Sequence, residues 1–451
     1  MYYVRLIDMA GSSSGTKPAV KFRDLVLVAT AAIIGTTIEW YDFFIAAISA
    51  GLVWPRIFLP PKVPPGIAMA YTLATSLLVG FVARPIGGFV FAHLGDRFGR
   101  KYALVWDLVL IGIGTLGIGL TPTFSQIGYG ALALVGIFMF IIGFGVGGEW
   151  GGAVTWVLEN AYVAGSRWRA FWASWVQQGV PLGLLAASSV LGLLAAIYGP
   201  NFLTAGWRIA FYAGAAIVVF GLAIRYALIE SALFEDTRYR YGVARRPSLE
   251  VWKYHWWPII LGVLLTAADL ALGYEFIAYS VPYMVGLGYQ RTFGLFTQAI
   301  ASLTAVFFII IFSMLGDKIG RRWVDVILFG IGIPYAYAYP LMLGTRDPAI
   351  AILAQILLWG FITMGGYSVM SAIIPEQFPT KYRYSGATMS YQVGAVVGGG
   401  MAPIILSVLI GTQFVARWWI LATVMAIYSF LGVISPLLMK ETKEAKLDQP
   451  S

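Results

Sequence analysis

The chain alternates between long apolar stretches and short polar ones, and this alternation limits the fold more than any other feature. An apolar run of about 20 residues predicts an α-helix that crosses a bilayer, because only a helix satisfies its own backbone hydrogen bonds over that length in lipid. The 451-residue sequence contains twelve such runs. They cover roughly residues 25–52, 67–91, 102–121, 127–158, 170–198, 207–229, 256–285, 292–315, 323–343, 348–374, 385–410 and 414–438.

Composition excludes the soluble classes of protein. Charged residues make up 11% of the chain, whereas a soluble domain has about 25%, and the mean hydropathy is +0.79. A soluble enzyme and a nucleic-acid-binding protein are therefore excluded. Cysteine is absent and there are two histidines, so we expect no catalytic residue, no metal site and no cofactor. No glycine-rich loop ends in Lys-Ser or Lys-Thr, which argues against ATP as the energy source.

The distribution of basic residues predicts the orientation. If the N-terminus is cytoplasmic, the cytoplasmic segments hold 22 Lys and Arg and the external segments hold 6. This asymmetry predicts a multi-pass protein of the plasma membrane with both termini in the cytoplasm. The expected division is an N-terminal tail (1–24), a six-helix half (25–229), a cytoplasmic linker (230–255), a second six-helix half (256–438) and a C-terminal tail (439–451).

Matched landmarks indicate that the two halves are duplicates. Residues 95–101 (GDRFGRK) follow the second span, and residues 316–322 (GDKIGRR) follow the eighth, at an offset of 221. Duplicated halves around a central cavity are typical of alternating-access transporters. We therefore predict an all-α membrane protein with twelve transmembrane helices in two pseudo-symmetric six-helix halves. The other matched pairs are Glu159 with Glu376, Arg169 with Arg383, and Glu230 with Glu441.

The charges of these loops suggest a gate. Acids and bases at the cytoplasmic ends of the spans can form ion pairs in one state of the transporter and break them in the other. The alternative is that they only fix the topology. The predicted gating residues in these loops are Asp96, Arg97, Arg100, Glu159, Arg169, Glu230, Asp317, Arg321, Glu376, Arg383 and Glu441.

Several further motifs identify a family. They comprise residues 96–101, 39–43 (EWYDF), 83–88 (ARPIGG), 147–152 (GGEWGG), 207–209 (WRI) and 375–383. With these motifs the sequence resembles the major facilitator superfamily, and within it the metabolite:proton symporter family. The resemblance implies the major facilitator fold and proton-coupled uptake of small organic acids or zwitterionic osmolytes. Met139 and Ile142 stand where the family usually has an arginine and a glutamine.

Acidic residues inside the spans are candidates for proton coupling, because an ionisable group in a membrane is costly unless it serves a function. Glu39 and Asp42 are three residues apart and share a helix face; the alternative for them is a packing role. Asp269 and Glu275 flank Gly273 in a span that also contains Pro282, which suggests an interrupted helix near a binding site. These acids favour a zwitterionic or cationic substrate.

Two further groups complete the predicted site. Arg84 and Glu149 lie at similar depths, and we expect them to form a structural or gating ion pair; Asp325, at the edge of its span, is expected to be solvated. Amides, phenols and indoles of the spans can orient a ligand or hold a quaternary ammonium by cation–π contact, although helix packing is the alternative for each. The candidates are Tyr41, Gln177, Gln178, Tyr274, Gln298, Trp359, Tyr367, Tyr391 and Gln392.

The sequence therefore predicts a secondary transporter that imports a small polar metabolite with protons. We expect it to act as a monomer in the lipid bilayer, with protons and a small-molecule substrate as its partners. A proton-antiport exporter on the same fold is the nearest alternative. A non-transporting membrane sensor is the alternative from another class, and a membrane-embedded enzyme is the third.

Overall fold

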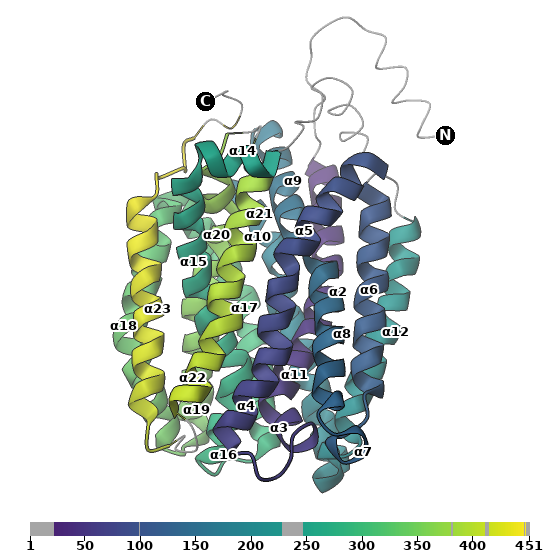
Figure 1. Ribbon diagram of the computed structural model, residues 1–451. Helices are drawn as coiled ribbons and strands as arrows, with labels where there is room; N and C mark the ends of the chain where they lie inside the picture. Colours follow the sequence, from purple (N-terminus) through teal and green to yellow (C-terminus); the bar gives the residue numbers. More distant parts are fainter. Residues whose placement is uncertain are drawn as a thin grey trace, which may run out of the picture.

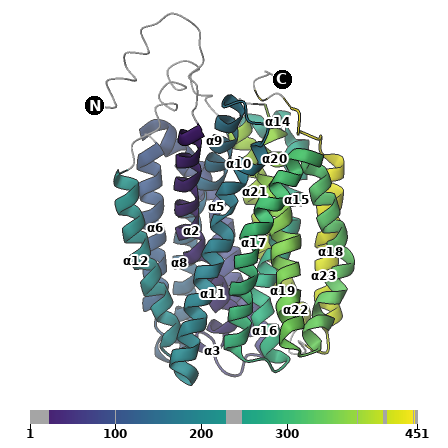
Figure 2. The ribbon, with the colours of Figure 1, turned by 180° about the vertical axis from the view of Figure 1, so that it is seen from behind.

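Long helices that run side by side between the two ends of the molecule make up the fold (Figures 1 and 2). The structure, a computed structural model, describes residues 22–98, 100–227, 247–379, 382–410, 415–445 and 447. Within these residues nearly everything is helical and no strand occurs. We call the end of the bundle that carries α14 the α14 end, and the opposite end, which carries α7, the α7 end.

The first half of the chain contributes six helical rods, some of which change helix type or break along their length. A short 3-10 helix, η2, precedes the last of them, and a π-helical segment, η1, interrupts the second. Its elements are α2 (Phe22–Leu52), α3 (Trp54–Ile57), α4 (Pro65–Leu73), η1 (Ala74–Leu78), α5 (Val79–Phe98), α6 (Arg100–Leu120), α7 (Phe124–Ile127), α8 (Gly130–Val146), α9 (Glu149–Val163), α10 (Arg169–Gln177), α11 (Gly179–Tyr198), η2 (Gly199–Leu203) and α12 (Gly206–Ala227).

The second half repeats this plan after α14 (Pro247–Tyr254), which lies across the end of the bundle. Three of its rods contain a π-helical segment, η3, η4 or η5. Its elements are α15 (Trp256–Tyr274), η3 (Glu275–Tyr279), α16 (Ser280–Gly286), α17 (Arg291–Ile319), α18 (Arg321–Gly344), α19 (Pro348–Gln355), η4 (Ile356–Thr363), α20 (Met364–Glu376), α21 (Arg383–Ala395), η5 (Val396–Met401), α22 (Ala402–Ile410) and α23 (Trp418–Leu438).

These rods confirm the predicted all-α class and the order of the spans. Ten described helices are long and apolar enough to cross a membrane, and two shorter apolar helices, Val105–Leu120 and Gly206–Val219, fall on the predicted third and sixth spans. The expected interruption in the seventh span takes the form of η3, where the helix widens and remains continuous. Of the predicted linker, residues 230–246 lie outside the described residues, and the remainder forms α14 and the turn after it.

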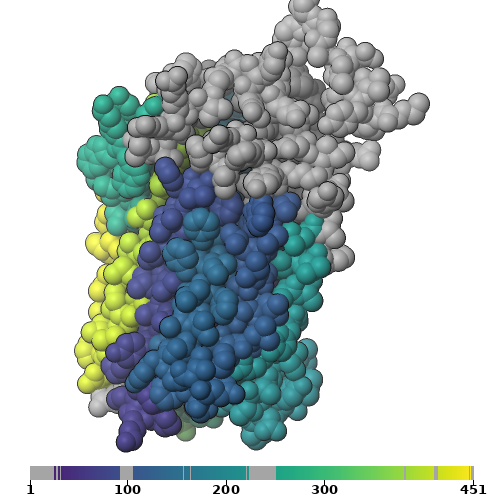
Figure 3. Space-filling view, turned by 45° about the vertical axis from the view of Figure 1, so that its right-hand side comes forward, coloured from purple at the N-terminus to yellow at the C-terminus, as the bar shows by residue number. Residues whose placement is uncertain are grey.

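The two halves stand side by side and meet along a broad surface. Helix α11 packs on α17, α4 packs on α22, and α9 and α10 pack on α21 and α20. Figure 3 shows helices of the first half in blue beside helices of the second in yellow-green. Large apolar side chains such as Phe89, Ile197 and Phe307 are more than half exposed on the outside, as expected for a surface that contacts lipid tails.

Candidate functional site

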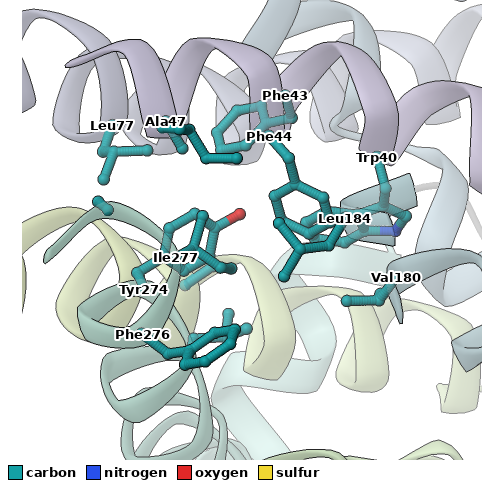
Figure 4. Packing of buried hydrophobic residues seen from close by; sticks show 14 of the residues in the cluster. Trp40, Phe43, Phe44, Ala47, Leu77, Val180, Leu184, Tyr274, Phe276 and Ile277 are labelled. Atoms are coloured by element: carbon teal, nitrogen blue, oxygen red, sulfur yellow. The ribbon is translucent and has the colours of Figure 1, made fainter. Parts of the chain in front are cut away.

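A small cavity lies between the two halves. Helices α2 and α11 contribute one wall, and α15, η3, η4 and α20 contribute the other. Figure 4 shows side chains of α2 and α11 facing those of α15 and η3 across this interface. The only charged side chain among the described lining residues belongs to Asp269, and most of the others are aromatic or aliphatic. The lining residues are Trp40, Phe44, Val180, Asp269, Leu270, Gly273, Tyr274, Ile277, Trp359, Met364 and Tyr367.

Arg84 lies directly behind this wall and does not form the predicted ion pair with Glu149. Its guanidinium carbon is 4.2 Å from the centre of the Phe43 ring, 4.5 Å from that of Phe81 and 5.1 Å from that of Trp40. The side chain is 1% exposed, and Nε and Nη2 donate no hydrogen bond to any described residue. Cation–π contact stabilises the charge only in part, so two buried donors stay available for an anionic group.

A column of aromatic rings connects Arg84 to the second half. The Phe81 ring, which lies against the Arg84 guanidinium, meets the Tyr274 ring edge to face with ring centres 5.0 Å apart. The hydroxyls of Tyr367 and Tyr391 are 2.8 Å apart, and Trp150 stacks on Tyr391 with ring centres 3.9 Å apart. Three predicted ligand-binding residues, Tyr274, Trp359 and Tyr367, line the cavity itself, whereas Tyr391 lies behind Tyr367.

The amide side chains that the sequence predicts as substrate ligands form hydrogen bonds between the halves. Gln177 accepts a hydrogen bond from Trp150 Nε1 and donates one to the Tyr367 carbonyl, 3.0 Å away. Gln178 donates to the Val306 carbonyl and Gln392 to the Gly147 carbonyl, so all three amides bond one half to the other. The sequence predicts them as substrate ligands. Sequence could not distinguish the two roles, because both require a polar group on a buried helix face.

Two other predicted ligands donate their hydrogen bonds within one half. Gln298 donates to the carbonyls of Phe276 and Ile277 in η3 and to Ser280 Oγ. The Tyr41 hydroxyl donates to the Ala210 carbonyl of α12. Neither side chain lines the cavity.

The acids of the first half fall into two groups. Glu39, Asp107 and Glu149 each place one carboxylate oxygen within 4.8 Å of the other two. Asp42 lies apart from this triad, because its Oδ1 occupies the space beside Gly214 on α12, next to Thr115. The sequence placed Glu39 and Asp42 on one face, but their partners come from helices distant in the chain.

Three acids inside the spans of the second half are buried. Asp269, Glu275 and Asp325 are 0%, 3% and 0% exposed, and none of their carboxylate oxygens accepts a hydrogen bond from a described residue. Asp269 lines the cavity, while Glu275 lies close to Tyr279, Tyr339 and Tyr428. The expectation that Asp325 is solvated was wrong, because α20 and α23 cover this face of α18.

The α14 end is closed by ion pairs between the halves. Glu376 of α20 binds Arg321 Nε at 2.7 Å and Arg169 Nε, from the first half, at 3.4 Å. Arg321 also binds Asp317, and the Asp317 carboxylate accepts hydrogen bonds from the backbone N–H groups of Ala170 and Phe171. A carboxylate at a helix N-terminus is favourable, so α17 and α10 are joined across the interface.

The C-terminal segment and a second ion pair complete this closure. Arg383 binds Glu159 of the first half at 2.8 Å. Arg169 donates to the carbonyls of Thr442, Lys443 and Ala445. Glu441 accepts from the N–H groups at the start of α18. Of the other predicted gating residues, Glu230 and the side chains of Asp96, Arg97 and Arg100 lie outside the described residues.

The α7 end is closed differently. At Gly51 a Cβ atom would overlap the Ala278 carbonyl oxygen of η3, so glycine permits α2 to approach the second half. Arg291 lies over the Phe202 ring at 5.9 Å, and nearer the cavity Ser188 donates a 3.4 Å hydrogen bond to Gln298. No ion pair between the halves occurs at this end among the described residues.

Comparisons with known proteins agree with this architecture. The family model of the Major Facilitator Superfamily matches residues 79–387. The chain is 37% identical to the inner membrane metabolite transport protein YhjE of Escherichia coli (strain K12), over 86% of this chain and 88% of that protein. It is 34% identical to the shikimate transporter of the same strain (91% and 93% covered) and 29% identical to its proline/betaine transporter (93% and 84% covered).

A solved structure gives the same result for the fold. The partially occluded inward-open conformation of the xylose transporter XylE from E. coli matches with a TM-score of 0.70, at 18% identity, over 94% of this chain and 99% of that chain. The chain therefore belongs to the Major Facilitator Superfamily and is a membrane transporter, not an enzyme.

Proposed function

We propose that the protein is a proton-coupled symporter that imports a small zwitterionic metabolite. The observation that carries this proposal is the cavity between the halves. It holds one carboxyl group, from Asp269, and an arginine, Arg84, lies behind its aromatic wall. Both charged groups have buried atoms that make no hydrogen bond with described residues. A ligand with one positive and one negative group would satisfy both.

The cavity wall suits the positive group of such a ligand. Rings of Trp40, Tyr274, Trp359 and Tyr367 surround the space beside Asp269, and aromatic faces bind ammonium groups by cation–π attraction. The carboxylate of the ligand would bind Arg84 after small rotations of the rings that cover it. Among the relatives, one is named a proline/betaine transporter and another a shikimate transporter, which supports a small substrate that carries a carboxylate.

Buried acids supply the proposed proton sites. Burial disfavours the charged form of a carboxyl group, so a substrate or a change of state that hydrates such a group alters its proton occupancy. Glu39, within its triad, and Asp269, in the cavity, are placed for this role; Asp42 and Glu275 are further candidates. Proton binding would then change the relative free energies of the two open states.

We propose that the α14 end faces the cytoplasm, as the positive-inside distribution of Lys and Arg favours, and that the monomer is the transporting unit. The halves contact each other at both ends of the cavity, and the ion pairs at the α14 end must break for release into the cell. Breaking them while the α7 end stays closed completes alternating access.

Proton flux into proteoliposomes that contain an internal pH dye tests the proposal. Glycine betaine, proline, shikimate and choline are added outside in turn. Acidification with glycine betaine or proline, but not with choline, is expected. Acidification with choline alone would contradict the role of Arg84, and alkalinisation would indicate a proton-antiport exporter. Unchanged acidification in a Glu39→Gln, Asp42→Asn double variant would remove those two acids from the coupling mechanism.

A further inference from the structure

Asp325 is a buried acid that the transport model above does not use. Its side chain is 0% exposed on α18, and neither carboxylate oxygen accepts a hydrogen bond from a described residue. An ionised carboxylate in such a place is costly. Isoleucine or leucine would fit a helix-packing role at lower cost, so the acid indicates a function that requires titration.

The position of Asp325 relates it to the cavity. A Cβ atom at Gly366 of α20 would be 3.4 Å from Asp325 Oδ1, so the carboxyl group packs on the bare backbone of α20 at that residue. The next residue, Tyr367, lines the cavity together with Asp269. Asp269 and Asp325 therefore flank the same turn of α20.

A third acid connects Asp325 with the surface of the α14 end. Glu441 is exposed at the α14 end, and its carboxylate accepts hydrogen bonds from the N–H groups of Arg321 and Arg322 in the first turn of α18. Asp325 lies on α18 one turn beyond Arg321, whose N–H group binds Glu441. The three carboxyl groups thus form a column from the cavity to the α14 end.

Other ionisable groups around α18 are engaged elsewhere. Helices α17 and α20 pack on α18 and present Asp317 and Glu376, but both bind Arg321. Helix α23 contributes Tyr428, whose hydroxyl donates to the Val397 carbonyl. Segments α19 and η4 contain no acid or base. Asp269 and Glu441 are therefore the described acids on either side of Asp325 that form no ion pair with a described base.

We propose that Asp325 is a proton-relay residue, and that Asp269, Asp325 and Glu441 form a proton path between the cavity and the α14 end. A proton leaves an oxygen of protonated Asp269 and binds a carboxylate oxygen of Asp325 through bridging water. The proton of Asp325 then passes to Glu441 and to bulk water. Asp325 and Glu441 return to their starting states, one proton has moved from the cavity to the α14 end, and Asp269 is left deprotonated until it binds the next proton from the cavity. This inference rests on the proposed proton symport.

Infrared spectroscopy of the reconstituted full-length protein tests the path without any substrate. The C=O stretch of protonated carboxyl groups is followed from acidic to alkaline pH. Asp325→Asn is expected to remove part of the pH-dependent band and to shift the pH at which the Asp269 contribution, identified with Asp269→Asn, titrates. A pH-dependent band identical to that of the wild type would overturn the proposal. If Asp325→Asn does not fold, the same titration is followed in Asp325→Glu, which keeps a carboxyl group at this position.

Transport measurements supply the functional readout, with whichever of glycine betaine, proline or shikimate acidifies the liposomes. Asp325→Asn should slow net proton-coupled uptake at least tenfold while exchange of labelled for unlabelled solute continues; Asp325→Glu should restore uptake. Equal loss of uptake and exchange would indicate a structural role only. Asp347→Asn is the matched control, because Asp347 is an exposed N-cap of α19 and asparagine caps equally well. If no solute acidifies the liposomes, the proposed function fails, and the infrared result still decides the inference.

Discussion

The two ends of the cavity are closed by different kinds of contact. At the α14 end, Arg169, Asp317, Arg321 and Glu376 form a buried network between the halves. At the α7 end the approach depends on Gly51, where bare backbone meets the second half. A charged network needs exact geometry and leaves costly groups behind when it opens. Separating an apolar contact costs little free energy beyond the lost packing, so the α7 end should open more readily in the absence of substrate.

The largest expected effect comes from blocking the apolar closure. Gly51→Val places side-chain atoms where the Ala278 carbonyl lies, so the α7 end can no longer close and transport should be abolished. The natural chain has no cysteine, so Ile277→Cys in the cavity can be labelled alone with a membrane-impermeant maleimide. Labelling from the α7 side should rise strongly in the valine background.

The control for this variant is Gly344→Val, since Gly344 also lies toward the α7 end and a Cβ atom there meets nothing within 4 Å. It should leave labelling and transport near those of the parent protein. Equal labelling of Ile277→Cys in both backgrounds would show that Gly51 does not control access from this side.

The second effect concerns the polar closure. Arg321→Met leaves the carboxylates of Asp317 and Glu376, whose side chains are 1% and 0% exposed, without their principal base. Removing one partner of a buried pair costs about 3–5 kcal/mol, so the thermal unfolding midpoint in micelles should fall and the α14 end should open. Adding Glu376→Gln removes one of the two stranded charges and should recover part of the loss. A double variant less stable than Arg321→Met would contradict this explanation.

The sequence predicted the rods better than the site. Span positions and their duplication follow from hydropathy and from motifs that occur twice, because in lipid each helix satisfies its own backbone. The contacts of a buried polar residue depend on which helices meet it. Gln177, Gln178 and Gln392 bond the halves together, Arg84 faces aromatic rings and not Glu149, and Asp325 is covered by neighbouring helices. The cavity residues that the sequence did identify, Tyr274, Trp359 and Tyr367, belong to helices rich in π-helical segments.

A third, intermediate effect separates bonds between the halves from bonds within one half. Gln177→Leu removes the acceptor of Trp150 and the donor to the Tyr367 carbonyl, and each buried group left unpaired costs about 1–3 kcal/mol. Because the bond to the Tyr367 carbonyl crosses the interface, labelling of Ile277→Cys from the α14 end should increase. Gln298→Leu is the matched variant: its amide N–H groups bond carbonyls of its own half. Its one bond across the interface, 3.4 Å from Ser188, is not at the α14 end, so stability should fall while labelling of Ile277→Cys from the α14 end stays the same. Increased labelling in both variants would contradict the distinction.

The smallest effect is expected at the edge of the polar closure. Glu159 binds Arg383, but its side chain is 38% exposed, and partly exposed ion pairs contribute about 0.2–1 kcal/mol. Glu159→Gln should therefore increase the labelling of Ile277→Cys from the α14 end only slightly. High salt should remove the difference from the protein with Glu159 by screening the pair.

Arg383→Gln should have the larger effect of the two, because Arg383 is 2% exposed and also donates to the Leu447 carbonyl of the C-terminal segment. If Glu159→Gln opened the α14 end as much as Arg321→Met, exposure would not set the strength of these pairs. The closure would then depend on the number of charges that cross the interface, and the contrast between a buried network and its solvated edge would have to be abandoned.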